Sequence, residues 1–141
     1  MQSRSLYMFT IVQIVAIAAL LWIVFSLPGT WDLQRDVGVA LMLMGTGGIA
    51  TARFHLGKSF AIRPKAQQLV THGIYSKIRN PIYVFGAIVL VGFVLVLHRP
   101  MLWFVVLAVV VMQTARARRE AKVLEAAFGD AYREYRRKTW F

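Results

Sequence analysis

The chain has 141 residues, is 58% hydrophobic and carries a formal net charge of +11. This length fits one domain, and the apolar fraction excludes an ordinary soluble domain. Because the chain has no cysteine, disulfides, thiolate metal sites and cysteine nucleophiles are excluded. The three histidines are too scattered along the sequence to indicate a metal site. The positive charge lies beside apolar runs, so anionic lipid headgroups match it better than nucleic acid does.

Four apolar runs predict an all-α integral membrane protein with four transmembrane helices and a cytoplasmic helical C-terminal extension, in a single domain over residues 1–141. The first run, residues 6–27, has the roughly 20 residues that a helix needs to cross about 30 Å of hydrocarbon. A signal peptide is the alternative for this run. The run is long for a signal peptide and no small-x-small cleavage site precedes Pro28, so we expect a retained helix.

The second run, residues 37–54, is rich in small residues. These are Gly45, Gly47, Gly48 and Ala50. Small residues let membrane helices approach one another closely. A glycine-rich phosphate loop is the sharper alternative, but the spacing fits no such motif and the segment is expected to lie at membrane depth. Close helix packing is therefore the expectation for this run.

The third and fourth runs, residues 81–97 and 101–115, are separated by only three residues. Such a short connection predicts that the two helices pack as an antiparallel hairpin. Each run is a little short for a full span, so we expect little tilt, or helix ends that lie below the headgroups. The polar residues 116–138 continue the fourth helix without a breaker as far as Gly129, where a short final helix begins.

Charge is distributed unevenly along the chain. Residues 53–80 carry six lysines and arginines and no acidic residue. The positive-inside rule places this segment in the cytoplasm. Four spans then put both termini in the cytoplasm as well, and the expected location is a bacterial inner membrane. A loop that serves only to fix this topology is the alternative to a loop that binds a ligand.

The segment at residues 57–80 has the features of a binding loop that turns sharply into a helix. Gly73 can adopt a positive φ that other residues resist. Pro81 pushes Asn80 out of the helical region and can begin the third helix in its first turn. The exposed N–H groups at that helix start, with two basic residues just before them, would suit a carboxylate or a phosphate.

Four residues of the C-terminal extension recur every four positions and so share one helix face: Arg116, Glu120, Leu124 and Phe128. The simplest interpretation of the first two is an exposed ion pair, worth a few tenths of a kcal/mol. The functional interpretation is a carboxylate and a guanidinium that meet a ligand. The predicted hairpin brings this face and the loop to the same side of the membrane. We therefore expect one polar pocket that contains Tyr75, Asn80, Tyr83, Arg116 and Glu120.

Two blocks of the sequence carry a resemblance to a known family. The first is Leu69-Val70-Thr71-x-Gly73-x-Tyr75-x-x-x-Arg79-Asn80-Pro81-x-Tyr83. The second is Arg116-x-x-x-Glu120-x-x-x-Leu124-x-x-x-Phe128-Gly129-x-x-Tyr132-x-x-Tyr135. In this order and at about this spacing, they resemble the signature of the isoprenylcysteine carboxyl methyltransferase family and its phospholipid methyltransferase relatives. The blocks cover the C-terminal half of the chain, and residues 1–60 match only as generic membrane helices.

The resemblance implies S-adenosylmethionine (SAM) as methyl donor, bound on the cytoplasmic side between the loop and the C-terminal helix. The residues that match cofactor-binding positions are Gln67, Gln68, Leu69, Val70, Gly73, Tyr75, Asn80, Pro81, Ile82, Tyr83 and Glu120. Arg116 matches a residue tied to the substrate, and Arg116 and Asn80 are the catalytic candidates. The lipid tail of the substrate is expected to enter from the bilayer between helices.

The chain departs from the family pattern at three positions. Asn80 stands where the family often has histidine, and asparagine cannot act as a titrating base near neutral pH. Ala121 stands in place of a second glutamate, and Gln67 in place of a common histidine. One carboxylate, that of Glu120, therefore remains to neutralise the positive charge of SAM or to hold its ribose or amino group.

Methyl transfer from a sulfonium is an in-line displacement, and its main demand is positioning. A carboxylate acceptor is already a nucleophile at neutral pH, whereas an amine or thiol must first lose a proton. Carboxyl O-methylation of a prenylcysteine-like or isoprenoid substrate is therefore the first expectation. Phospholipid N-methylation and thiol S-methylation on the same fold are alternatives, as are a nicotinamide-dependent membrane reductase and a non-enzymatic lipid-docking protein. The expected partners are a lipid-like substrate and membrane lipids, without nucleic acid or a metal.

Overall fold

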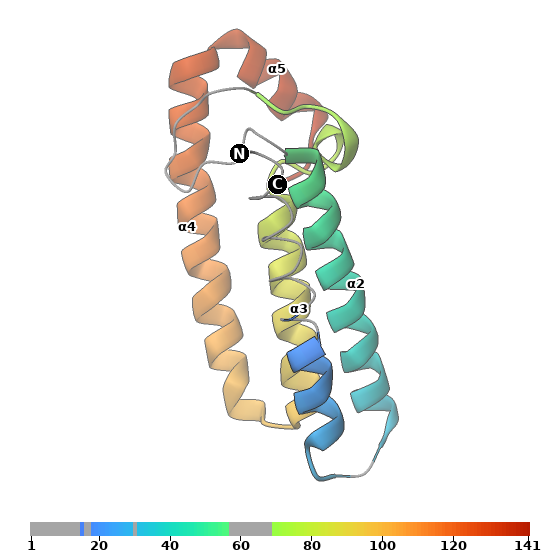
Figure 1. Cartoon of the computed structure of the whole chain (residues 1–141). Coiled ribbons are helices and arrows are strands. Elements are labelled where there is room, and N and C mark those ends of the chain that lie inside the picture. The colour runs from blue at the N-terminus through green and yellow to red at the C-terminus, as the bar shows by residue number, and fades with distance from the viewer. Residues whose placement is uncertain (1–14, 16–17, 30, 57–68) are drawn as a thin grey trace.

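The computed structural model describes residues 15, 18–29, 31–56 and 69–141, and the regular elements in these ranges are helices (Figure 1). Residues 18–26 are helical. The named elements that follow are α2 (Leu33–Leu56), η2 (Gly73–Ser76), α3 (Pro81–Leu97), η3 (Pro100–Leu102), α4 (Trp103–Phe128) and α5 (Asp130–Lys138). Helices α2, α3 and α4 run lengthwise, and α5 crosses one end of them (Figure 1).

Helices α2 and α3 pack with their backbones almost in contact. A Cβ atom placed on Gly92 would lie 2.5 Å from the main-chain oxygen of Gly38, and one on Gly45 would lie 2.8 Å from that of Phe85. Because these distances leave no room for a side chain, glycine is required for the approach. The prediction of close packing is confirmed for Gly45, whereas a Cβ on Gly47 would meet no atom within 4 Å.

Helices α3 and α4 form the predicted antiparallel hairpin, and α3 has the predicted bounds. The C-cap of α3 is His98, whose φ of 52° is left-handed, as is usual where a helix ends abruptly. Pro100 then begins the single turn η3. Helix α4 continues without a break from Trp103 to Phe128, because no helix-breaking residue separates its apolar half from its polar half.

Among the described residues, two helical stretches are long and apolar enough to cross a membrane: α2 and the stretch Pro100–Phe128. Helix α3 is apolar but shorter, with 17 residues. Half of the predicted first span, residues 6–27, lies outside the described residues. The architecture is therefore all-helical with two candidate membrane spans by length and composition, and the four-span topology remains a prediction.

The end of the bundle that holds the α3–α4 connection is tied together by polar side chains. Asp32, just before α2, accepts a hydrogen bond from Nε2 of His98 at 2.9 Å. The amide of Gln34 donates to the main-chain oxygen of Leu95 at 3.1 Å. Arg35 is only 3% exposed, and its guanidinium donates to main-chain oxygens at the end of the preceding helix, including that of Leu27 at 3.1 Å. These contacts fix the start of α2 against the end of α3.

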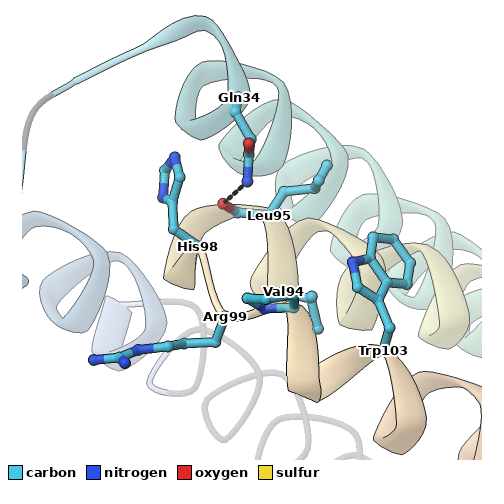
Figure 2. A pocket seen from close by; sticks show the side chains of 7 residues that line it. Gln34, Val94, Leu95, His98, Arg99 and Trp103 are labelled. Carbon is cyan, nitrogen blue, oxygen red and sulfur yellow. Dashed lines mark hydrogen bonds between the residues drawn. The ribbon is translucent and has the colours of Figure 1, made fainter.

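A cavity of about 380 Å³ opens at this same end (Figure 2). It is lined by Gln34, Val94, Leu95, His98, Arg99, Pro100 and Trp103. The predicted site lies at the Pro81 end of α3, whereas the cavity lies at the other end. It is therefore not the pocket that the sequence predicts.

We expect Gly92→Ala to destabilise the protein, because the added methyl group would force α2 and α3 apart. Overpacking of this kind costs about 1–3 kcal/mol. Gly47→Ala is the matched control, because its methyl group meets open space, and it should leave stability unchanged or raise it by up to about 1 kcal/mol through helix propensity. Melting followed by circular dichroism in detergent measures both. Equal melting temperatures for the two variants would contradict this packing.

Candidate functional site

A three-residue contact joins the first turn of α3 to the middle of α4. The hydroxyl of Tyr83 donates to Oε1 of Glu120 at 2.6 Å, and Nε of Arg116 donates to the same oxygen at 3.1 Å. The guanidinium carbon of Arg116 also lies 5.9 Å from the centroid of the Tyr83 ring. The prediction that these three side chains meet is therefore confirmed.

The two hydrogen bonds to Glu120 differ in strength. The Arg116 side chain is 62% exposed, so its i,i+4 pair with Glu120 contributes only about 0.3–0.5 kcal/mol. The Glu120 side chain is 31% exposed, and a neutral hydroxyl bound to a shielded charge contributes about 1.5–3 kcal/mol. Tyr83 is therefore the main anchor of the carboxylate. Among the described residues, no side chain or N–H donates to the second oxygen, Oε2, which leaves that oxygen for a ligand.

Tyr75 lies on the short helix η2 and is 7% exposed. Burial raises the pKa of the Tyr75 phenol far above its usual range, and the nearby Tyr135 and Glu120 raise it further against an opposing effect of Arg53. The phenol therefore stays neutral at any physiological pH. The main-chain oxygen of Tyr75 accepts a hydrogen bond from the hydroxyl of Tyr135, which ties η2 to α5.

The loop before Tyr75 packs against the last turn of α2. Gly73 has a φ of +61°, as predicted, and a Cβ atom on it would collide with the imidazole of His55. The rings of His55 and His72 lie edge to face with centroids 6.1 Å apart. Nδ1 of His55 lies 2.8 Å from the main-chain oxygen of Thr51, which can only accept. Nδ1 therefore carries the proton, and Nε2 is the basic nitrogen of the neutral ring.

Sequence reasoning missed His55 as a site residue. It lies in a run of ordinary helical sequence, and its partner His72 is 17 positions away with no motif between them. The only signal was Gly73. The sequence explains this glycine by its positive φ, but it does not reveal the second reason, which is that the imidazole of His55 occupies the space where a side chain would lie.

Asn80 lies at the predicted turn into α3, and its donors bind another part of the chain. Pro81 does begin α3, and Asn80 precedes it as N-cap with φ −122° and ψ 58°. However, the main-chain N–H of Asn80 donates to the main-chain oxygen of Phe141 at 2.9 Å, and its Nδ2 donates to the same oxygen at 3.1 Å. Both donors of Asn80 are thus bonded within the chain, because residues 139–141 run alongside this turn.

The other predicted positions are distributed as follows. Leu69 and Val70 are half-buried just before η2, and Ile82 is half-buried in the first turn of α3. Gln67 and Gln68 lie outside the described residues, as does the first half of the predicted loop at residues 57–80. Within the part of the chain that the structure describes, no group of three or more metal-ligating side chains comes together.

A double-mutant cycle tests which contact holds Glu120. We expect Tyr83→Phe and Glu120→Ala to show a coupling free energy of unfolding of about 1–3 kcal/mol, because each removes the same shielded hydrogen bond. Arg116→Ala and Glu120→Ala should couple by only about 0.3–0.5 kcal/mol. Reversible unfolding in detergent measures both values. A larger coupling for Arg116 than for Tyr83 would contradict the order of strengths given above.

Comparison with known proteins agrees with this geometry. A family described as phospholipid methyltransferase matches residues 33–131. The match runs from the start of α2 into α5 and includes Tyr75, Tyr83, Arg116 and Glu120. No curated protein matches the chain. Because the matched segment covers well over half of the sequence and contains the clustered side chains, the chain belongs to the phospholipid methyltransferase family.

Proposed function

We propose that the chain transfers a methyl group from SAM to a lipid-like acceptor at the membrane surface. The family implies a membrane methyltransferase that acts on lipid-like substrates. The observation that supports the finer proposal is the cluster around Glu120, because it joins the start of α3 to the middle of α4 at the end of the bundle that also carries η2 and α5.

The residues at this end fit SAM by their chemistry. SAM carries a sulfonium and an ammonium group, and the shielded Glu120 carboxylate has one oxygen, Oε2, that no described residue occupies. A partly desolvated carboxylate attracts a cation more strongly than an exposed one does. Tyr75 offers a neutral hydroxyl, and Leu69 and Val70 offer apolar contact. Bound here, SAM would supply the electrophilic methyl group. Gln67, Gln68, Gly73 and the turn at residues 80–83 complete the proposed set.

The acceptor that these residues match best is a phospholipid amine. Arg116 uses only Nε for Glu120, so its terminal nitrogens remain to bind a phosphate in bidentate fashion. His55 supplies what the sequence alone lacked, an imidazole beside the loop whose Nε2 can take a proton from an ammonium group. Arg116 holds the headgroup and His55 Nε2 accepts the proton, which leaves the amine nitrogen with a free electron pair.

Carboxyl O-methylation is the second candidate, and the position of Arg116 favours it. An exposed guanidinium next to the cluster can hold a carboxylate as well as a phosphate, and a carboxylate needs no base. In this case His55 would have no part in the reaction. The two candidates therefore differ in what they require of His55.

The proposed topology places the site at the cytoplasmic face, with four spans and both termini inside. The distribution of charge supports it. Basic residues collect at the end that carries η2 and α5, including Lys77, Arg79 and Arg133, whereas Asp32 and Asp36 lie at the other end of α2. This asymmetry follows the positive-inside rule.

Titration calorimetry with SAM tests the donor site. We expect saturable binding by the wild type, and a loss of affinity of at least about tenfold in both Glu120→Ala and Tyr75→Ala, about 1.4 kcal/mol. Asp32→Ala removes a carboxylate at the opposite end of α2 and is the control, which should bind SAM normally. Absence of SAM binding, with saturable binding of a nicotinamide cofactor instead, would favour the reductase alternative. Absence of both would favour a non-enzymatic lipid-docking protein.

Radiolabelled methyl transfer distinguishes the two acceptors. With vesicles of a primary-amine phospholipid, we expect label that base does not release as methanol, and a loss of rate on the order of 100-fold in His55→Gln at neutral pH. The loss should persist at saturating SAM and should shrink at alkaline pH, where the amine loses its proton unaided. His98→Gln, at the opposite end, is the control. Base-labile label on a farnesylated cysteine analogue, with normal activity in His55→Gln, would identify the carboxyl acceptor instead.

A further inference from the structure

Helix α5 holds the loop that contains Tyr75 through one buried hydrogen bond. The hydroxyl of Tyr135 donates to the main-chain oxygen of Tyr75 at 2.7 Å, and both residues are less than 10% exposed. Burial raises the pKa of the Tyr135 phenol to about 12, and neighbouring Tyr132 adds to this shift. The phenol therefore keeps its proton and remains a donor at physiological pH.

Residues 139–141, named here the strap, continue this hold along the same loop. The N–H of Trp140 donates to the main-chain oxygen of Lys77 at 2.7 Å, and the N–H of Arg79 donates to that of Trp140 at 3.0 Å. Ile78 and Trp140 form a parallel bridge. The two donors of Asn80 then reach Phe141. Between Tyr75 and Asn80, the backbone is thus bonded at four residues (75, 77, 79 and 80) to α5 and the strap, about 60 positions later.

The hydrogen bonds of the strap use the backbone of the loop and leave its side chains free. Tyr75, Lys77 and Arg79 each contribute only main-chain atoms to them. Asn80 is the exception, because its amide side chain donates to Phe141 as well. The main-chain oxygen of Phe141 accepts hydrogen bonds from both donors of Asn80, so Asn80 fixes the strap against the turn.

We propose that Tyr135 and Asn80 are positioning residues, and that α5 and the strap form a clamp that holds the donor-binding loop in its binding conformation. Without the clamp, the loop would have to be ordered at the expense of binding free energy, since fixing a mobile backbone costs conformational entropy. The clamp therefore acts on the affinity for the donor more than on the rate of the chemical step. The part of this inference that concerns SAM rests on the proposed function.

A pair of neighbouring tyrosines gives the matched test. Tyr135→Phe removes the hydrogen bond to Tyr75, whereas Tyr132→Phe removes the hydroxyl of another buried tyrosine that makes no hydrogen bond to any described residue. We expect Tyr135→Phe to raise the Kd and the KM for SAM about tenfold and to leave kcat within about twofold. Tyr132→Phe should change neither. Equal effects of the two variants, or a fall in kcat at unchanged KM, would overturn the proposal.

Limited proteolysis measures how firmly the clamp holds the loop, and it does not require SAM. Trypsin cleavage after Lys77 should be about tenfold faster in Tyr135→Phe than in Tyr132→Phe, because the loop is freed only in the first. Trp140→Pro deletes the N–H that bonds Lys77 and should have the same effect, whereas Trp140→Ala keeps that N–H and should not. Unchanged cleavage in both Tyr135→Phe and Trp140→Pro would refute the clamp. If the wild type binds no SAM while cleavage follows this pattern, the clamp stands and the proposed function fails.

Discussion

The close approach of α2 and α3 sets the positions of the side chains and of the Gly73 loop at the polar end of the bundle. Glycines at positions 38, 45 and 92 bring the two backbones together, so the last turn of α2 ends level with the start of α3. Only at this separation can His55, near the end of α2, fill the space above Gly73. A packing constraint between two apolar helices therefore decides which polar side chain borders the loop.

Helix α4 is attached to α2 and α3 mainly at two points, its start and its middle. The turn after α3 holds its start, and the hydrogen bond from Tyr83 to Glu120 holds its middle. Between these points α4 presents exposed apolar side chains, such as Leu107 at 61% and Val111 at 59%. Exposed side chains of this kind suit contact with lipid tails. A lipid-like acceptor and a carboxylate anchored at the polar end are thus compatible with one helix, apolar along its first half and charged along its second.

The polar end combines groups from four parts of the chain, and each has a distinct task. Glu120 supplies shielded negative charge, Tyr83 holds it, and Tyr75, buried on η2, supplies a neutral phenol. Asn80 makes its hydrogen bonds to the chain itself. This explains why position 80 does not need a titrating side chain. Asparagine can donate to Phe141 through its main-chain N–H and through its side-chain amide, and neither donor depends on pH.

Local rules in the sequence were sufficient for much of the fold. The apolar runs and the short connection predicted α3, its bounds and the hairpin, since helix length and turn chemistry act over a few residues. Pro81 and Gly73 marked a helix start and a positive φ for the same reason. The four-residue period placed Arg116 and Glu120 on one face, and the hairpin brought Tyr83 to them.

The sequence by itself thus determined the helices, the sharp turn into α3 and the meeting of Tyr83 with Glu120. Only the tertiary structure decided that His55 lies on Gly73 and that the strap takes the hydrogen-bond donors of Asn80. Both contacts depend on how far apart two packed segments lie and in which direction a main chain runs beside a turn. Neither quantity has a periodic signal in the sequence, because backbone hydrogen bonds are open to every residue type except proline, and a gap between helices is set by many side chains together.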